Sequence, residues 1–94
     1  MTHLSRFHHS HFAKVRAEAA CFDAADLTGA RFFKADLTST TFHRAKLVSV
    51  DFGKARLDAT SFEGAMLYDA NFVGAKGHST SFEGARLTHT ARRA

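Results

Sequence analysis

Positively charged side chains recur at intervals of twenty residues along this 94-residue chain. Two such series lie two positions apart, and Asp36 interrupts the second of them. Together with one neighbouring arginine, they form a set that we call the basic ridge: Lys14, Arg16, Arg31, Lys34, Lys54, Arg56 and Lys76. Stripes of cations are typical footprints for acidic partners, nucleic acids among them. The basic ridge is therefore a candidate partner-binding surface; the alternative is the solvated surface of a protein whose net charge is +4.

Another series at the same spacing carries side chains that can ligate metals. It reads Asp23, His43, Glu63 and Glu83. Such a series is a candidate ladder for divalent cations, but no cysteine and histidine spacing of the tetrahedral kind accompanies it. Solvated carboxylates with a paired histidine are the favoured interpretation.

No arrangement typical of an enzyme accompanies these residues. His8, His9 and His11 stand close together in the sequence, but no second cluster completes a dedicated metal site. The one cysteine, Cys21, has no base placed to activate it as a nucleophile. Serine–histidine–aspartate, phosphate-loop and paired-carboxylate patterns do not occur. We expect a non-enzymatic protein that uses no metal and no cofactor.

The spacing of twenty belongs to a shorter repeat that runs through most of the chain. Phenylalanine or leucine fills fifteen of the seventeen positions, five residues apart, from 7 to 87. The exceptions are Ala17 and Gly77, and the residue two before each position is Ala, Ser, Thr or Val. Phenylalanine and leucine alternate, which doubles the period to ten, and Thr40, Thr60 and Thr80 double it again.

A period of five fits neither the 3.6 residues of a helical turn nor the 2 of a strand. It fits a chain that turns a corner every five residues, with one large and one small side chain pointing inward at each step. Four steps close a square, so residues twenty apart stack one rung apart, at the ~4.8 Å spacing of a strand ladder. We expect an all-β solenoid of about four coils. It would be a single domain over 1–94, with repeats at about 5–88 and short tails.

The repeating units resemble those of the pentapeptide-repeat family, whose usual unit reads A-[D/N]-L-x-x with phenylalanine alternating for leucine. Matching units are "ADLTG" at Ala25, "ADLTS" at Ala35 and "ANFVG" at Ala70. The resemblance extends from Ser5 to about Thr88. It implies a right-handed quadrilateral β-helix.

Two places depart from the repeat. The segment 13–20, "AKVRAEAA", is rich in helix formers, and its inward position holds only Ala17. A short helix that caps the N-terminal end and an imperfect first coil are both open interpretations. At Gly77 no side chain fills the inward position, so we expect a void or a bend in the last full coil.

Apolar residues at outward positions are few: Phe33, Val48, Met66, Tyr68 and Val73. Val48 and Tyr68 share one series of twenty, and Met66 lies close to them. These three residues form a second candidate contact surface.

The ends of a β-helix expose unpaired strand edges, which invite association unless they are covered. After Leu87 the chain continues with "THTARRA", which is charged and places Arg92 at the next inward position. We expect a homodimer through the C-terminal coil around Phe72, Phe82 and Leu87.

The sequence also bears on location and function. No apolar run approaches the ~18 residues of a membrane span, and no signal-peptide pattern opens the chain. A single cysteine forms no internal disulfide, so a cytosolic compartment is expected. The family resemblance implies that this is the cytoplasm of a bacterial host.

The family resemblance implies a binding role. Relatives bind DNA gyrase by imitating duplex DNA with an acidic rod, and this chain departs from them in being basic. The expected function is stoichiometric inhibition of a nucleic-acid-handling complex, in the manner of the small anti-CRISPR proteins that act on Cas effectors. The alternatives are a gyrase- or topoisomerase-binding protection protein and a direct nucleic-acid binder that uses the basic ridge.

Overall fold

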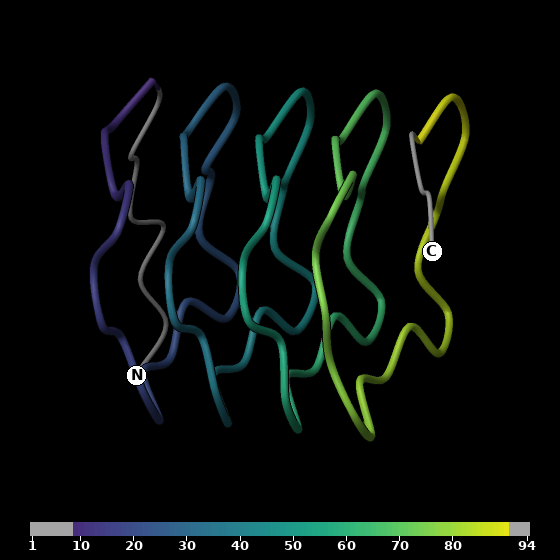
Figure 1. The fold of residues 1–94 in the computed structure, drawn as a ribbon. Helices are drawn as coiled ribbons and strands as arrows, with labels where there is room; N and C mark the ends of the chain where they lie inside the picture. Colours follow the sequence, from purple (N-terminus) through teal and green to yellow (C-terminus); the bar gives the residue numbers. More distant parts are fainter. Residues whose placement is uncertain (1–8, 91–94) are drawn as a thin grey trace.

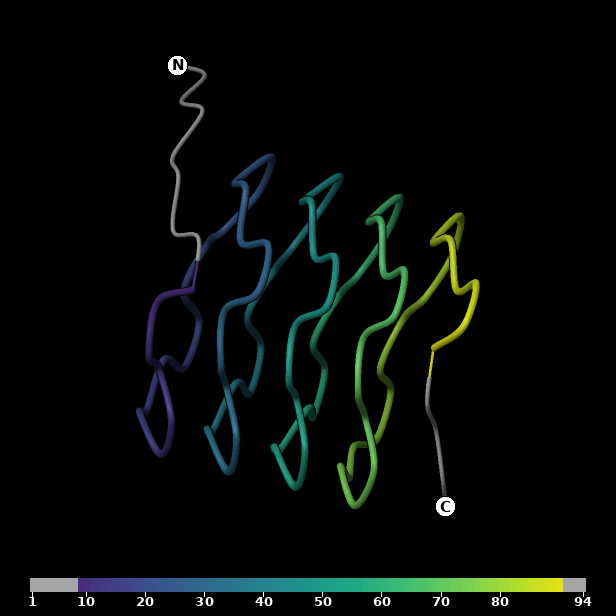
Figure 2. The ribbon, with the colours of Figure 1, turned by 90° about the horizontal axis from the view of Figure 1, so that it is seen from above.

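The computed structural model describes residues 9–90, which follow one continuous coil from end to end (Figure 1). Parallel β-bridges join residues twenty positions apart, beginning with His11 and Arg31 and ending with Met66 and Arg86. Within 9–90 these single-residue bridges are the only strand pairing, and neither a helix nor a longer strand forms. Successive coils therefore lie side by side along a rod (Figure 2). The predicted stacking of residues twenty apart is confirmed.

Backbone hydrogen bonds tie each side of a coil to the next coil. On the first side described, the Arg31 amide donates to the Ser10 carbonyl at 2.9 Å, and the Phe12 amide donates to the Arg31 carbonyl at 2.6 Å. The Lys14 amide then donates to the Phe33 carbonyl at 2.9 Å. The same pattern recurs around the coil, so most backbone groups are paired although no long strand exists.

Within residues 9–90 each corner places one residue in the left-handed region, and every corner except the one at residues 78 and 79 is a tight turn. At the first such corner the Val15 amide donates to the Phe12 carbonyl at 3.2 Å, and Lys14 has a φ of 62°. A turn in which only the third of the four residues has a positive φ is a type II turn. Thirteen of these third residues are not glycine, and each costs about 1–2 kcal/mol relative to ordinary backbone. The hydrogen-bonded ladder has to offset that strain at each of these thirteen corners.

Residues 13–20 follow the coil and form no helix. A turn at residues 13 and 14 is followed by the bridge from Arg16 to Asp36, and a second turn lies at residues 18 and 19. The interpretation of an imperfect first coil is confirmed, and the helical alternative is wrong. Ladder hydrogen bonds to the next coil outweigh the local helix propensity of this segment. The predictions for Ser5, Phe7, His8 and Arg92 lie outside the described residues.

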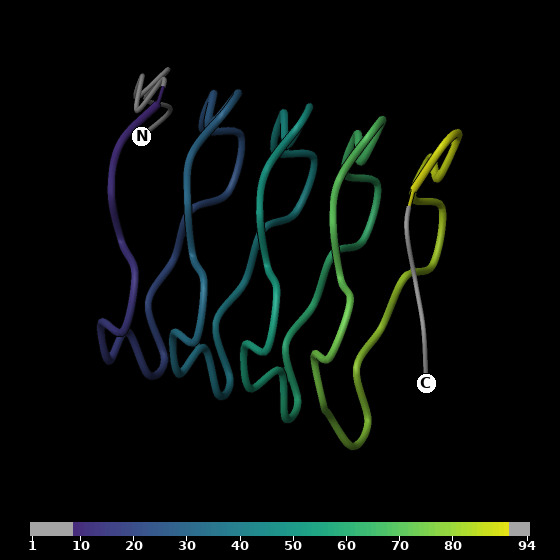
Figure 3. The same cartoon turned by 45° about the horizontal axis from the view of Figure 1, so that its top comes forward.

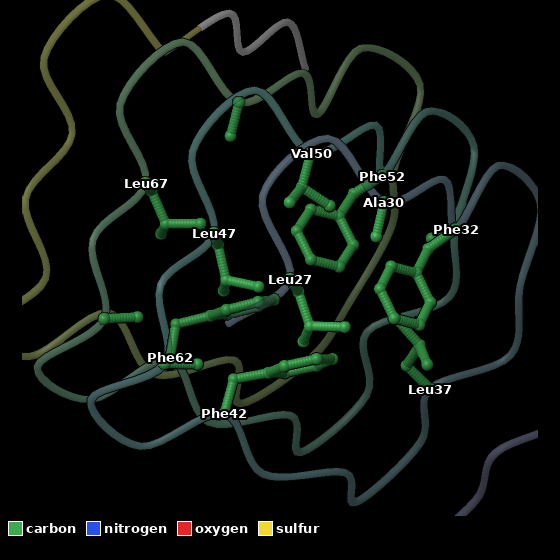
Figure 4. Close-up of a cluster of buried hydrophobic side chains, with 14 of the residues drawn as sticks. Leu27, Ala30, Phe32, Leu37, Phe42, Leu47, Val50, Phe52, Phe62 and Leu67 are labelled. Carbon is green, nitrogen blue, oxygen red and sulfur yellow. The ribbon is translucent and has the colours of Figure 1, made fainter. Parts of the chain in front are cut away.

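Two stacks of phenylalanine rings fill half of the interior. One stack contains Phe12, Phe32, Phe52 and Phe72, and the other contains Phe22, Phe42, Phe62 and Phe82. Neighbouring rings within a stack have centroids 4.7–5.3 Å apart. Rings of the two stacks meet edge to face at 5.2–5.8 Å, a favourable geometry for aromatic pairs. Leu27, Leu47 and Leu67 line another side (Figure 4).

Threonine occupies the small inward position on one side of the coil, where its hydroxyl donates to a carbonyl of the preceding coil. Thr60 Oγ1 donates to the Leu37 carbonyl at 2.7 Å, and Thr80 Oγ1 donates to the Leu57 carbonyl at 2.6 Å. Thr40 makes the equivalent bond to the Ala17 carbonyl at 2.5 Å. Buried hydroxyls are tolerated only with such partners. The twenty-residue threonine period is therefore a ladder of hydrogen bonds on one side of the coil.

The left-handed corners predict an unusual stabilising substitution. Ala59 is exposed with a φ of 56°, so Ala59→Gly should raise the free energy of unfolding by about 0.5–1 kcal/mol, because glycine adopts this backbone without strain. Ala55→Gly, at a buried position where φ is not positive, should lower it by about 1 kcal/mol or more. Urea unfolding followed by circular dichroism measures both. Equal destabilisation by the two variants would contradict the strain at the corner.

Candidate polyanion-binding surface

All seven residues of the basic ridge are exposed. Bridges place Arg16 beside Asp36, Asp36 beside Arg56 and Arg56 beside Lys76 on successive rungs. Lys34 and Lys54 come two residues before Asp36 and Arg56. Each of these lysines is the third residue of the turn that leads into that bridge position. Two rows of outward side chains, separated by one corner, therefore run along the rod together. The alignment expected from the spacing of twenty is present, whereas its role as a binding surface stays a prediction.

An aromatic ring lies between two lysines of the ridge. The Lys34 and Lys54 ammonium nitrogens lie 5.3 and 6.0 Å from the centroid of the Phe33 ring, within the range of a cation–π interaction. Gly53 makes room for this ring, because a Cβ there would lie 3.1 Å from Phe33 Cδ1. Phe33 was expected only as an exposed apolar residue, and its contact with the ridge lysines was not predicted. Its position next to Lys34 was the available signal.

Two carboxylates partly neutralise the positive charge of the basic ridge. Asp58 Oδ2 lies 3.5 Å from Arg56 Nε. Asp36 accepts a hydrogen bond of 2.6 Å from Thr38 Oγ1, and this bond lowers the pKa of Asp36 below its ordinary value of 3.8. Burial opposes that effect, while the Thr38 amide and the charges of Arg56 and Arg16 lower the pKa further. Asp36 is therefore ionised at neutral pH and reduces repulsion between its two arginine neighbours.

The structure brings three ridge residues around one open hollow with a volume of about 630 Å³. Its lining consists of Lys54, Ala55, Arg56, Asp58, Gly74, Lys76, Gly77 and His78. At this corner a bend at residues 78 and 79 replaces the hydrogen-bonded turn. The chain here, green to yellow-green, follows a wider loop than at the corresponding corners of earlier coils (Figure 3). Gly77 was expected to leave a void or a bend, and this expectation is confirmed.

The lining of the hollow contains two ionisable residues that the sequence did not predict for the site. Asp58 and His78 are twenty positions apart and follow Arg56 and Lys76 by two residues. The period itself could have found them. The hollow, however, depends on where the backbone moves when Gly77 leaves its inward position empty, and the repeat pattern does not specify that movement.

The apolar candidate surface is less exposed than expected. Val48, Met66 and Tyr68 are all half-buried. Arg86 Nη1 donates to the Tyr68 hydroxyl at 3.4 Å, and this bond raises the pKa of Arg86. Of the large hydrophobic side chains in 9–90, Val73 is the exposed one, at 45%. The three-residue surface offers little free apolar area to a partner.

The three residues expected at a dimer interface differ in exposure. Phe72 is 5% exposed and stacks inside the rod, 5.0 Å from Phe52. Phe82 and Leu87 are half-buried. Of the three residues, only Phe82 and Leu87 have exposed side-chain surface to offer, and the homodimer itself stays a prediction.

The series that begins at Asp23 contains the paired histidine that its sequence indicates. His43 Nδ1 lies 3.5 Å from Asp23 Oδ2, and the His43 amide donates to Asp23 Oδ1 at 2.9 Å. Burial raises the pKa of Asp23, but hydrogen bonds from Thr41, the His43 amide and Cys21 outweigh it and lower the pKa. Among residues 9–90 no three His, Cys, Asp or Glu side chains lie close enough together to hold a metal ion.

Over residues 9–90 no apolar helix of membrane-spanning length occurs.

Comparisons with known proteins agree on the repeat. A family model described as pentapeptide repeats matches residues 25–64 and 55–90, with eight copies. No curated protein sequence matches the chain significantly.

Solved structures show the same fold at low sequence identity. The chain is similar to a pentapeptide repeat protein of the Arabidopsis thaliana thylakoid lumen, with a TM-score of 0.56 and 22% identity over 95% of this chain and 69% of that one. It is also similar to HetL of Nostoc sp. strain PCC 7120, a protein involved in the regulation of heterocyst differentiation. That match has a TM-score of 0.53 and 21% identity, over 93% of this chain and 47% of HetL.

The Asp36 contact predicts a measurable titration. The lowered pKa means that Asp36 stabilises the folded chain fully above the unfolded pKa of ~3.9, and that this contribution is lost as the pH falls through the folded pKa. Thr38→Val removes the largest favourable contact and should move the pKa of Asp36 upward. Carboxyl NMR titration of both proteins measures the shift. An unchanged Asp36 pKa in the variant would contradict the role given to Thr38.

Proposed function

Because the chain belongs to the pentapeptide-repeat family, we propose that it is a non-enzymatic binding protein whose basic ridge docks on nucleic-acid phosphates within a nucleic-acid-handling complex. By occupying those phosphates it would inhibit the complex stoichiometrically. The observation that carries this proposal is the alignment of exposed cations in two adjacent rows along the rod.

The energetics of the ridge support an anionic partner. Like charges one rung apart repel each other, as like charges do across a sheet, so fold stability alone does not favour this arrangement. A partner with closely spaced phosphates relieves the repulsion and releases its own counterions on binding. The Phe33 ring between Lys34 and Lys54 adds an apolar face on which a base can stack, as in single-strand binding proteins.

The finer proposal is anti-CRISPR-like inhibition of a Cas effector complex in a bacterial cytoplasm, which rests on the family resemblance. Protection of gyrase or another topoisomerase is the alternative partner. DNA mimicry of the usual kind needs an acidic rod, and the net charge of +4 argues against it here. We further propose that the coil is right-handed and makes about four turns, as this family resemblance implies.

Titration of a labelled DNA duplex at low and near-physiological salt tests the ridge. We expect affinity to fall steeply with salt, because each neutralised phosphate adds about 0.9 to the logarithmic slope. Lys34→Glu combined with Lys54→Glu should weaken binding by about tenfold or more. The matched control combines Arg44→Glu with Lys46→Glu, which makes the same charge change at exposed positions half a coil away.

Each outcome of that titration has a defined meaning. If both double variants lost the same amount of DNA affinity, the loss would follow from net charge alone, and the basic ridge would not be a specific binding surface. Absence of DNA binding at low salt would leave a protein surface as the partner, and pull-downs with Cas effector complexes and gyrase would then be decisive. If Tyr68→Ala and Met66→Ala abolished those interactions while the ridge variants did not, the apolar surface would replace the ridge.

We also propose that two copies associate through the C-terminal coil at Phe82 and Leu87. Phe82→Glu should shift the protein to monomers, because a buried unpaired carboxylate is costly at an apolar contact. Multi-angle light scattering at high micromolar concentration measures the mass, with Glu83→Gln as the control at an adjacent exposed position. A monomeric mass for the unmodified protein would disprove the dimer.

A further inference from the structure

The hollow lies where the repeat is broken. Every inward position from 22 to 87 holds phenylalanine or leucine except position 77. Gly77 packs tightly in its place, because an added Cβ would lie 2.7 Å from the Leu57 carbonyl oxygen and would also collide with Thr80 Oγ1. The backbone therefore takes up space that a leucine side chain fills in the coil below. A depression is left on the outer surface, and side chains of two adjacent coils surround it.

The side chains around the depression give it a net positive charge. Lys54, Arg56 and Lys76 contribute three cations and Asp58 one carboxylate, which leaves +2 with His78 neutral. The carboxylate is already engaged, since Asp58 accepts a hydrogen bond of 3.0 Å from the His78 amide and lies 3.5 Å from Arg56 Nε. It can hold the Arg56 guanidinium in place at the rim while the two ammonium groups carry uncompensated charge.

Glycines bring the cations and the backbone close to the space between them. Lys54 lies over Gly74, where an added Cβ would be 3.0 Å from Lys54 Cγ. The backbone of Gly77 also lines the hollow. Backbone beside a cluster of cations is a recurrent setting for phosphate groups.

Charge and size together select the ligand. A phosphate monoester carries about −1.5 to −2 at pH 7, which matches the +2 of the lining, whereas a backbone diester carries only one charge. The volume of about 630 Å³ lies within the range of small-molecule sites, and a bare phosphate would fill little of it. The ligand should therefore carry further atoms beside the phosphate, as a nucleotide does.

We propose that the hollow at Gly77 is a binding site for the terminal phosphate of a nucleotide, either free or at the 5′ end of a nucleic acid. The proposal deepens the proposed function, because three of the lining residues belong to the basic ridge. It differs from that function in its ligand, since a mononucleotide does not need the rest of the ridge.

Titration of the ¹⁵N-labelled chain with thymidine 5′-monophosphate tests the site by NMR. We expect saturable shifts of the Gly74, Gly77 and His78 amides with a dissociation constant in the range of about 0.1–1 mM, and none with thymidine. Lys54→Gln and Lys76→Gln should each weaken binding by about fivefold. Lys46→Gln, at an exposed bridge position half a coil from Arg56 and one and a half coils from Lys76, should change it less than about twofold.

A second variant tests the cause of the hollow. Gly77→Leu places the repeat residue at this position and should abolish nucleotide binding, because its Cβ collides with the Leu57 carbonyl oxygen and forces the local backbone to move. If this variant does not fold, the lysine variants still decide the matter. Equal shifts with thymidine, equal loss in Lys46→Gln and Lys76→Gln, or no saturation at about 10 mM nucleotide would each overturn the site.

Binding of two oligonucleotides of the same sequence, one with and one without a 5′-phosphate, distinguishes a nucleic-acid end from a free nucleotide as the ligand. Tighter binding of the phosphorylated strand, with shifts at Gly77, supports a nucleic-acid end as the ligand. Equal binding of both strands, together with binding of the mononucleotide, supports a free nucleotide. Failure of duplex DNA to bind would refute the proposed function alone, since the mononucleotide titration does not involve duplex.

Discussion

Phenylalanine rings from successive coils stack with centroids 4.7–5.3 Å apart, close to the ~4.8 Å between paired strands. The side chains and the backbone therefore repeat at the same distance along the rod, and neither has to distort for the other. The second stack meets the first edge to face, so the width of the interior is fixed as well. Only alanine, valine, serine or threonine fits beside the rings, which accounts for the small residue at every inward pair.

The same constraint determines how the surface is organised. A coil this narrow must turn every five residues, and each turn forces one residue into the left-handed region. Lysine and arginine occupy some of these strained corners, although glycine would adopt them at lower cost. Since every coil has the same length, side chains at one corner form rows along the rod. The rigid interior thus gives the cations of the basic ridge a regular spacing that a flexible loop would not maintain.

One departure from the repeat changes the surface more than any outward residue does. Gly77 removes a side chain from the interior, and the backbone and the corner turn both adjust around it. Positions that break a local rule without improving packing often serve function rather than stability. Here the break coincides with a cluster of three cations and one engaged carboxylate. The structural irregularity and a net positive part of the ridge therefore occupy the same corner.

The sequence by itself determined the coil. Spacings of five and twenty fixed the inward residues, the stacking of Phe32 on Phe52 and the row of Arg16, Asp36, Arg56 and Lys76, because a repeat with constant geometry converts sequence distance directly into spatial position. Only the tertiary structure decided the places where that geometry fails or where side chains bend. It excluded a helix at 13–20, since ladder bonds to the next coil override local propensity. It placed Phe33 between two lysines and formed the hollow at Gly77, because both depend on contacts between coils that no single repeat contains.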